Sequence, residues 1–353
     1  MPLCIRVSAS TACQLRCPNC NIWPGSYCQG SSDGFLKATD FEKFLQLNPF
    51  VRYVELSHTG EIFLNPDLAA IIEIAAAHRV ELSACGGCNF NSADEKILKL
   101  MVKTGFRRLH ISLDGPDQKS YATYRRRGQF KTVIANIKKL NALKKKHQAL
   151  YPQLQLDYVI LPHNHSRSQL QAVKKLAQSL DATVQFFKDY RRYVPTDKKM
   201  IAEETGLLYD ENEIYQVYTD DGAKSFFSGQ SNSFYCSDLW KFPQINIDGR
   251  FLGCCCNSWQ AFDTPNAFEQ SLRKILHSRS VKATKKMLRG GRVYAAAPCI
   301  ACKFYKMMLY NHQFLRSHHI KATLRVDFRR FYAILTRRHD QSQSARAPSG
   351  TPL

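Results

Sequence analysis

The sequence predicts an α/β protein built on a parallel sheet. Six short segments of strand composition alternate with amphipathic helical segments between residues 4 and 190, a pattern typical of β–α–β units with right-handed crossovers. The chain has 353 residues, enough for one large domain and a smaller second one. A doubly wound sheet and a partial barrel both agree with this alternation, and periodicity does not separate them.

The strand segments are rich in β-branched and aromatic residues and end at turn residues. They cover residues 4–8, 51–57, 80–84, 109–113, 153–161 and 183–187. Helical spacing predicts helices over 40–47, 67–78, 93–104, 130–148 and 168–180. Thr39 or Asp40 is the expected cap of the first helix, and Gly105 ends the third. Residues 189–235 lose this periodicity and are predicted to form a linker or lid.

The composition points to a basic, cysteine-rich protein. The formal net charge is +21 and the chain contains 13 cysteines. The charge favours an anionic partner, although we expect much of it to be solvated surface. The sequence contains no apolar run long enough to span a membrane and no signal peptide, so we expect a cytoplasmic protein. In that compartment many cysteines indicate metal or redox chemistry rather than disulfides.

Three cysteines follow the first strand in the spacing C-x3-C-x2-C: Cys13, Cys17 and Cys20. Thiolates held this close can bind three irons of a four-iron cluster and leave the fourth iron open. An open metal position is typical of catalytic rather than structural sites. Cys28 lies eight residues beyond Cys20 and keeps a zinc or closed-cluster site as an alternative.

This stretch resembles the signature of the radical S-adenosylmethionine (radical SAM) superfamily, with Asn19 replacing an aromatic residue that is common in the family. The resemblance implies a partial (β/α)6 TIM-like barrel with its chemistry at the carboxyl ends of the strands. It also implies a [4Fe-4S] cluster whose open iron binds S-adenosylmethionine. Reductive cleavage then yields a radical that removes hydrogen from a substrate C–H bond. A reductant such as flavodoxin or ferredoxin is the expected partner.

Three downstream residues extend the resemblance to cofactor contacts. Thr59-Gly60-Glu61 is similar to the family's Gly-Gly-Glu turn, which implies that Glu61 holds the methionine amino group. Ser112 precedes a turn similar to the one at the cofactor ribose, and Arg125 matches an arginine that faces the cofactor carboxylate. An arginine can bind a carboxylate through two parallel hydrogen bonds.

A Cys-x-x-Cys pair, Cys85 and Cys88, closes the third strand. Such a pair suggests a redox couple or half of a metal site. Two ordinary loop thiols are the alternative, and we favour it.

A second cysteine set lies in the C-terminal part of the chain. A hairpin over 245–252 would bring Cys236 and Cys254 together, and Cys299 and Cys302 would complete four thiolates, a set that suits zinc or a cluster. The spacing resembles the twitch domain, a shortened SPASM domain, which implies an auxiliary [4Fe-4S] cluster. Cys255 and Cys256 adjoin Cys254 and are alternative ligands.

The segment after residue 310 is strongly basic, and four of its apolar residues recur at helical spacing: Leu324, Phe328, Phe331 and Leu335. This face could contact a membrane surface or pack on the core. The last residues, 340–353, lack large apolar groups and are predicted to be disordered.

The expected organisation is a radical SAM core over 1–190, a linker or lid over 191–235, a cluster domain over 236–310 and a basic extension over 311–353. The expected function is a two-electron oxidation of a small sugar-like or anionic substrate. One alternative is a SPASM-type peptide maturase, for which we expect no leader-binding segment ahead of Cys4. The other is a non-catalytic, zinc-stabilised basic binding protein.

Overall fold

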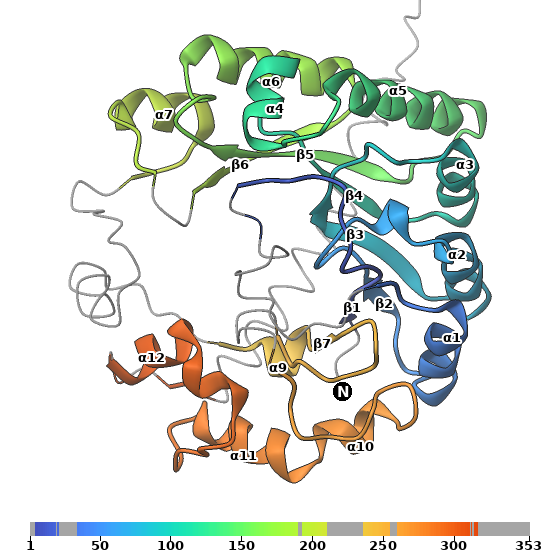
Figure 1. Cartoon of the computed structure of the whole chain (residues 1–353), viewed down its shortest axis with the longest axis vertical. Coiled ribbons are helices and arrows are strands. Elements are labelled where there is room, and N and C mark those ends of the chain that lie inside the picture. The colour runs from blue at the N-terminus through green and yellow to red at the C-terminus, as the bar shows by residue number, and fades with distance from the viewer. Residues whose placement is uncertain are drawn as a thin grey trace, which may run out of the picture.

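The structure is a computed structural model that describes residues 4–18, 20, 34–189, 193–209, 236–254, 260–310, 312 and 314–316. Its centre is a seven-stranded sheet in the order β6-β5-β4-β3-β2-β1-β7, with every neighbouring pair parallel. The strands are β1 Cys4–Val7, β2 Tyr53–Glu55, β3 Glu81–Cys88, β4 Arg108–Ser112, β5 Gln153–Ile160, β6 Thr183–Lys188 and β7 Gln244–Ile245. The sheet curves as in a partial barrel (Figure 1), which confirms the expected fold class.

Helices cover the outer face of this curved sheet (Figure 1). Those packed along it are α1 Ala38–Leu47, α2 Leu68–Ala77, α3 Glu95–Thr104, α5 Phe130–Lys146 and α6 Arg167–Ser179. Shorter helices are α4 Gln118–Tyr124 and α7 Lys198–Thr205, and two single turns are η1 Ile62–Leu64 and η2 Pro298–Ala301. The C-terminal part adds α9 Asp238–Lys241, α10 Leu272–Leu276, α11 Arg279–Met287 and α12 Lys303–Tyr310.

The core lies between the sheet and these helices because alternate strand residues point outward. In β5 the buried positions are Leu154, Leu156, Tyr158 and Ile160, and each lies in one hydrophobic cluster with helix residues such as Leu170. Burying a side chain of this size contributes roughly 1.5–3 kcal/mol relative to exposure. The apolar residues at alternate positions of each strand therefore determine which face of the sheet packs against the helices. The residues between them face the interior of the barrel.

Helix ends follow the local chemistry in most places. Gly105 adopts φ 72° and ends α3 as expected, and Ser166 forms a capping box with Gln169 at the start of α6. The cap expected for the first helix was wrong. α1 begins at Ala38, whose N–H donates to the Asp67 carboxylate at 3.0 Å, so a residue from the next helix start supplies the acceptor.

Other boundaries also differ from expectation. β2 is limited to Tyr53–Glu55, whereas β3 continues through Cys88. The predicted linker contains α7, and α4 was not expected at all.

The hairpin predicted over 245–252 is present: Ile245 and Phe251 form an antiparallel bridge, the Leu252 N–H donates to the Gln244 carbonyl at 2.9 Å, and Gly249 has φ 79° in the turn. Gln244 and Ile245 also pair in parallel with β1 and form a seventh strand that was not predicted. The two pairings coexist because they use different groups: the Ile245 carbonyl accepts from the Ser8 N–H, whereas the Gln244 carbonyl accepts from within the hairpin.

Several expectations fall on residues outside the described ranges. These are Cys28, Cys255 and Cys256, together with the basic segment and tail beyond residue 316. In the described part of the chain, no helix is both long and apolar enough to cross a membrane.

Candidate active site

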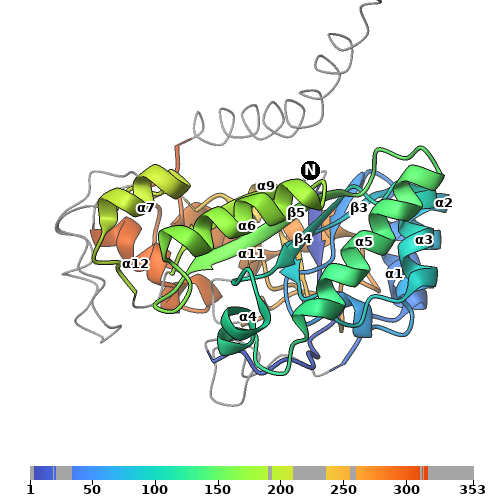
Figure 2. The same cartoon turned by 90° about the horizontal axis from the view of Figure 1, so that it is seen from above.

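The candidate site lies where the strands end, because parallel strands bring the segments after their carboxyl ends to one edge of the sheet. The cysteine loop follows β1 directly. It is tied across the edge by the Arg16 N–H, which donates to the Arg126 carbonyl at 3.0 Å. Figure 2 shows α4 beside this loop. The loop turns tightly, since the Cys20 N–H donates to the Cys17 carbonyl at 3.1 Å.

The three thiols of this loop lie in a largely buried environment. The pKa of Cys13 is raised to about 11, chiefly by burial, and the nearby Glu61, Cys17 and Cys20 act in the same direction. Metal binding here would therefore displace protons from the thiols. A four-iron cluster places each ligand on a different iron, so three thiolates from one loop can bind three irons and leave the fourth iron open.

The turn after β2 packs against the backbone that leads into the cysteine loop. A Cβ on Gly60 would lie 2.6 Å from the Ser10 carbonyl oxygen and 2.7 Å from that of Ala12, and Gly60 has φ 64°. Only glycine satisfies both conditions without displacing the loop. Thr59 replaces the family's first glycine without strain on this contact, because its hydroxyl donates to the Ser10 carbonyl at 3.1 Å.

Glu61 follows this turn and is buried beneath the loop. Its backbone N–H donates to the Ala12 carbonyl at 2.7 Å, and its carboxylate accepts from the N–H groups of Phe63 and Asn89 at 3.3 and 2.5 Å. Burial raises the pKa of Glu61 to about 7, although these two donors act in the opposite direction. A buried carboxylate in this state gains most from a cationic ligand such as an ammonium group.

Arg125 connects the cysteine loop to the end of β4. Its Nε donates to the Asp114 carboxylate at 2.5 Å, and its guanidinium lies 3.8 Å from Cys17 Sγ. Burial lowers the pKa of Arg125, but Asp114 and Cys17 more than offset this and raise it above the ordinary value. Asp114 is fully buried at φ 52° and also accepts from the Val159 N–H at 2.7 Å. Arg125 is therefore a fixed cation beside the thiols.

Ser112, the third predicted cofactor residue, ends β4 next to the glycine pair of β3. A Cβ on Gly87 would lie 2.7 Å from Ser112 Oγ. Gly87 also has φ 98°, so a side chain there would be both strained and crowded. The structure thus brings Ser112, Glu61 and Arg125 to the same edge as the three cysteines.

A network of hydrogen-bonded side chains lies beside the cysteine loop, and its individual contacts were not predicted from the sequence. Asn89 Nδ2 donates to Gln14 Oε1 at 3.1 Å and to Cys13 Sγ at 3.6 Å, and Gln14 Nε2 donates back to Asn89 Oδ1 at 3.0 Å. Asn91 Nδ2 donates to the Tyr121 hydroxyl at 2.9 Å. The network positions the cysteine loop against β3 and α4. The signal available in the sequence was the Asn-rich turn after the third strand.

Cys85 and Cys88 lie within β3 rather than in a loop. Burial raises the pKa of both thiols well above the ordinary value. Cys88 Sγ donates to the His110 carbonyl at 3.3 Å. Buried, protonated thiols of this kind are unreactive, which favours the alternative of ordinary thiols over a redox couple.

The second cysteine set is assembled from three segments. Cys254, Cys299 and Cys302 are buried, and the Cys302 N–H donates to the Cys299 carbonyl at 3.0 Å in the turn η2. Burial raises the pKa of Cys236, and the nearby Cys299 and Cys302 thiols add to this. Cys236 is therefore within electrostatic range of Cys299 and Cys302. Cys254 is also buried and follows the turn after β7.

Comparisons with known proteins show what this chain is similar to. The radical SAM superfamily profile matches residues 7–162, which include the cysteine loop and strands β2–β5. GTP 3′,8-cyclase of Chlorobaculum tepidum is 21% identical over 309 residues, covering 81% of this chain and 88% of the relative.

Solved structures give the same fold assignment. Streptococcus suis SuiB bound to S-adenosylmethionine superposes with a TM-score of 0.58 at 14% identity, covering 87% of this chain and 72% of SuiB. SuiB bound to its precursor peptide SuiA gives 0.57 at 14% identity, with 87% and 71% covered. At this identity the likeness concerns the fold. The superfamily profile match assigns residues 7–162 of the chain to the radical SAM superfamily.

Proposed function

We propose that this radical SAM enzyme cleaves S-adenosylmethionine reductively and oxidises a substrate C–H bond by two electrons. The observation that carries the proposal is the set of three thiols after β1, with Glu61 and Arg125 fixed beside them. A three-thiol loop leaves one iron of a four-iron cluster without a protein ligand. A carboxylate and a guanidinium at the same edge complement the ammonium and carboxylate of the methionine moiety.

The chain's own residues would then divide the work. Cys13, Cys17 and Cys20 would hold the cluster, which supplies an open iron and the electron that cleaves S-adenosylmethionine. Glu61 would accept hydrogen bonds from the methionine ammonium. Arg125, held by Asp114, would orient the carboxylate, and Ser112 would contact the ribose.

The second cysteine set would hold the electron acceptor that this oxidation requires. Cys236, Cys254, Cys299 and Cys302 would hold an auxiliary [4Fe-4S] cluster. The substrate would transfer one hydrogen atom to the 5′-deoxyadenosyl radical, one electron to this auxiliary site and one proton to a base. Methionine and 5′-deoxyadenosine leave as products, and the substrate is oxidised by two electrons.

A peptide substrate is the second candidate. SuiB, whose fold this chain shares, has been crystallised with its precursor peptide SuiA. A peptide maturase would use the same S-adenosylmethionine cleavage and differ only in what occupies the barrel.

The test begins with anaerobic purification of the full chain. Two clusters predict about eight irons per chain and 5′-deoxyadenosine on addition of dithionite and S-adenosylmethionine. Zinc in place of iron, with no 5′-deoxyadenosine, would contradict the proposal and support a structural zinc protein. Product release after a substrate is supplied would distinguish a small molecule from a peptide.

A further inference from the structure

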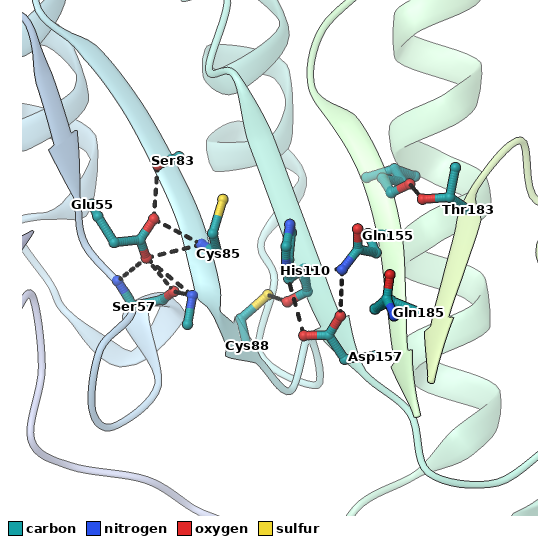
Figure 3. A network of polar contacts seen from close by, with 12 residues as sticks. Glu55, Ser57, Ser83, Cys85, Cys88, His110, Gln155, Asp157, Thr183 and Gln185 are labelled. Atoms are coloured by element: carbon teal, nitrogen blue, oxygen red, sulfur yellow. Dashed lines mark hydrogen bonds and ion pairs between the residues drawn. The ribbon is translucent and has the colours of Figure 1, made fainter. Parts of the chain in front are cut away.

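The inner face of the curved sheet is polar along its central strands. In β5 the residues that alternate with the buried ones are Gln153, Gln155, Asp157 and Val159; all four are half-buried and the first three are polar. Figure 3 shows polar side chains of β2–β6 on the face of the sheet opposite the helices. In closed (β/α)8 barrels this interior is filled by branched apolar residues. A polar row at the same place indicates an interior that receives a polar molecule.

At the β2 end of this row, the polar groups hydrogen-bond to one another. The Glu55 carboxylate accepts from the N–H and hydroxyl of Ser57, the hydroxyl of Ser83 and the N–H groups of Cys85 and Gly86, at 2.7–3.2 Å. A carboxylate with this many donors has no acceptor capacity left for a ligand. Glu55 therefore fixes the ends of β2 and β3 and is not part of the binding surface that we propose.

The other end of the row keeps acceptor capacity. Gln155 Nε2 donates to Asp157 Oδ1 at 2.8 Å and lies 3.2 Å from His110 Nδ1. Asp157 Oδ2 lies 3.6 Å from the same His110 nitrogen, beyond hydrogen-bond length. The side chains of His110 and Asp157 are 16% and 15% exposed. They thus form a half-buried wall with a carboxylate oxygen that can accept a further hydrogen bond.

This wall lies next to the candidate active site. Asp157 is in register with Ser112, the last residue of β4, and with Gln185 of β6. Asp114, two residues after Ser112, pairs with Arg125, which contacts Cys17. A molecule held against the wall would therefore occupy the barrel interior beside the edge where the cysteine loop lies.

We propose that His110, Gln155 and Asp157 bind a neutral, hydroxyl-rich group of the substrate, such as the ring of a sugar or cyclitol. A carboxylate, an amide and an imidazole together accept and donate hydrogen bonds, which matches neighbouring hydroxyl groups. An anionic group would meet the Asp157 carboxylate at short range and be repelled. An apolar group would leave the polar atoms of the wall without partners, which is costly when they are removed from water.

The proposal rests on the proposed function for its location and narrows the substrate class. Of the sugar-like and anionic substrates expected from the sequence, it selects the sugar-like class. On this proposal, the net charge of +21 is a property of the protein surface and does not select the substrate inside the barrel.

Three six-membered rings test the chemistry directly: myo-inositol, cyclohexylamine and cyclohexanecarboxylate. Binding to the anaerobic, cluster-loaded full chain with S-adenosylmethionine and no reductant is measured by saturation-transfer NMR. We expect myo-inositol to bind more tightly than the other two rings. Asp157→Asn should weaken myo-inositol binding about tenfold, the loss expected for a hydrogen bond to a charged group.

Thr183→Ala is the matched control, because Thr183 lies on the neighbouring strand, is exposed and donates only to the Leu154 carbonyl. It should leave binding unchanged. His110→Asn is a second wall variant in case Asp157→Asn does not fold, and it should also weaken binding. Tighter binding of either charged ring, absence of myo-inositol binding, or equal effects of wall and control variants would overturn the proposal. Because no reductant is present, such a result is separate from a failure to form 5′-deoxyadenosine, which would count against the proposed function.

Discussion

The two cysteine sets are built in opposite ways. Cys13, Cys17 and Cys20 belong to one short loop, and side chains from elsewhere reach two of their sulfurs: Asn89 reaches Cys13 and Arg125 reaches Cys17. In the second set, Cys299 lies in the turn η2 and Cys302 follows it; both are buried, as is Cys254, whereas Cys236 is half-buried. The first set is surrounded by groups that can bind a ligand. Most thiols of the second set are buried, as we expect of a site that only transfers electrons.

The charged groups that act on the two sets also differ. Asp114 keeps Arg125 charged beside the first set and raises its pKa despite burial. In the second set, Asp238 raises the pKa of Cys236 and forms an ion pair with Arg6 at 3.2 Å. The first set thus has a cation beside its thiols, whereas the charge that acts on Cys236 is a carboxylate. Elsewhere in the C-terminal part, Lys285 lies 5.4 Å from the Trp240 ring, and burial lowers its pKa to about 8.

The largest expected effect separates the catalytic from the auxiliary set. Replacing Cys13, Cys17 and Cys20 together by alanine should abolish 5′-deoxyadenosine formation and remove about half of the iron, since the second set has its own four thiols. Iron analysis and chromatography of the reaction mixture measure both quantities. The double variant Cys85→Ala/Cys88→Ala is the control and should keep the iron. Retained S-adenosylmethionine cleavage in the triple variant would mean that another site performs it.

A smaller, selective loss is expected from the second set. Changing Cys299 and Cys302 to alanine should leave 5′-deoxyadenosine formation detectable while substrate oxidation fails, because the electron acceptor is lost. Cluster binding contributes to folding, so the melting temperature should also fall. Circular dichroism checks that the sheet remains folded. Normal product formation by this variant would show that the second set is structural only.

The smallest effect is on stability and concerns Lys285 of α11, whose pKa is lowered by burial. Lys285 has a pKa of about 8 in the folded chain and an ordinary value of 10.5, so the folded state binds fewer protons than the unfolded state between these pH values. Stability therefore rises as the pH increases from about 8 to 10.5. Lys285→Met should be more stable than the wild type at pH 7, on the order of 1 kcal/mol.

That advantage should shrink as the pH approaches 10. Melting temperatures at pH 7 and 9.5 measure it, and Lys282→Met, on the exposed face of the same helix, should show no such pH dependence. A stability difference that is constant with pH would show that Lys285 acts through packing rather than charge.

The parts of the fold that depend on local pattern could be predicted from the sequence. Alternating strands and helices, Gly105 as a helix end and the loop of Cys13, Cys17 and Cys20 all follow from neighbouring residues. The failures involve partners distant in the chain. Asp67 caps α1 from 29 residues away, and β7 pairs with β1, a strand distant in sequence, in addition to its predicted hairpin partner.

The candidate site shows the same division. Glu61, Ser112 and Arg125 were predicted from motifs. Asn89 and Asp114 lie in turns that also resemble the family's, but their tertiary hydrogen bonds to Gln14 and Arg125 were not predicted. The polar wall could have been found: the sequence of β5, QLQLDYVI, alternates polar and apolar residues. In a parallel strand, where both faces are usually buried, such alternation indicates that one face lines a polar interior.

The seventh strand has a consequence for solubility. β7 pairs with β1 through Arg6↔Gln244 and Val7↔Ile245, and Arg6 also forms an ion pair with Asp238 at 3.2 Å. A fragment that ends before Gln244 would expose the backbone donors and acceptors of β1 along an open sheet edge. Such edges pair with one another and promote aggregation. The N-terminal barrel segment thus depends on the C-terminal part of the chain to protect its first strand, and expressing the two halves separately should yield insoluble barrel.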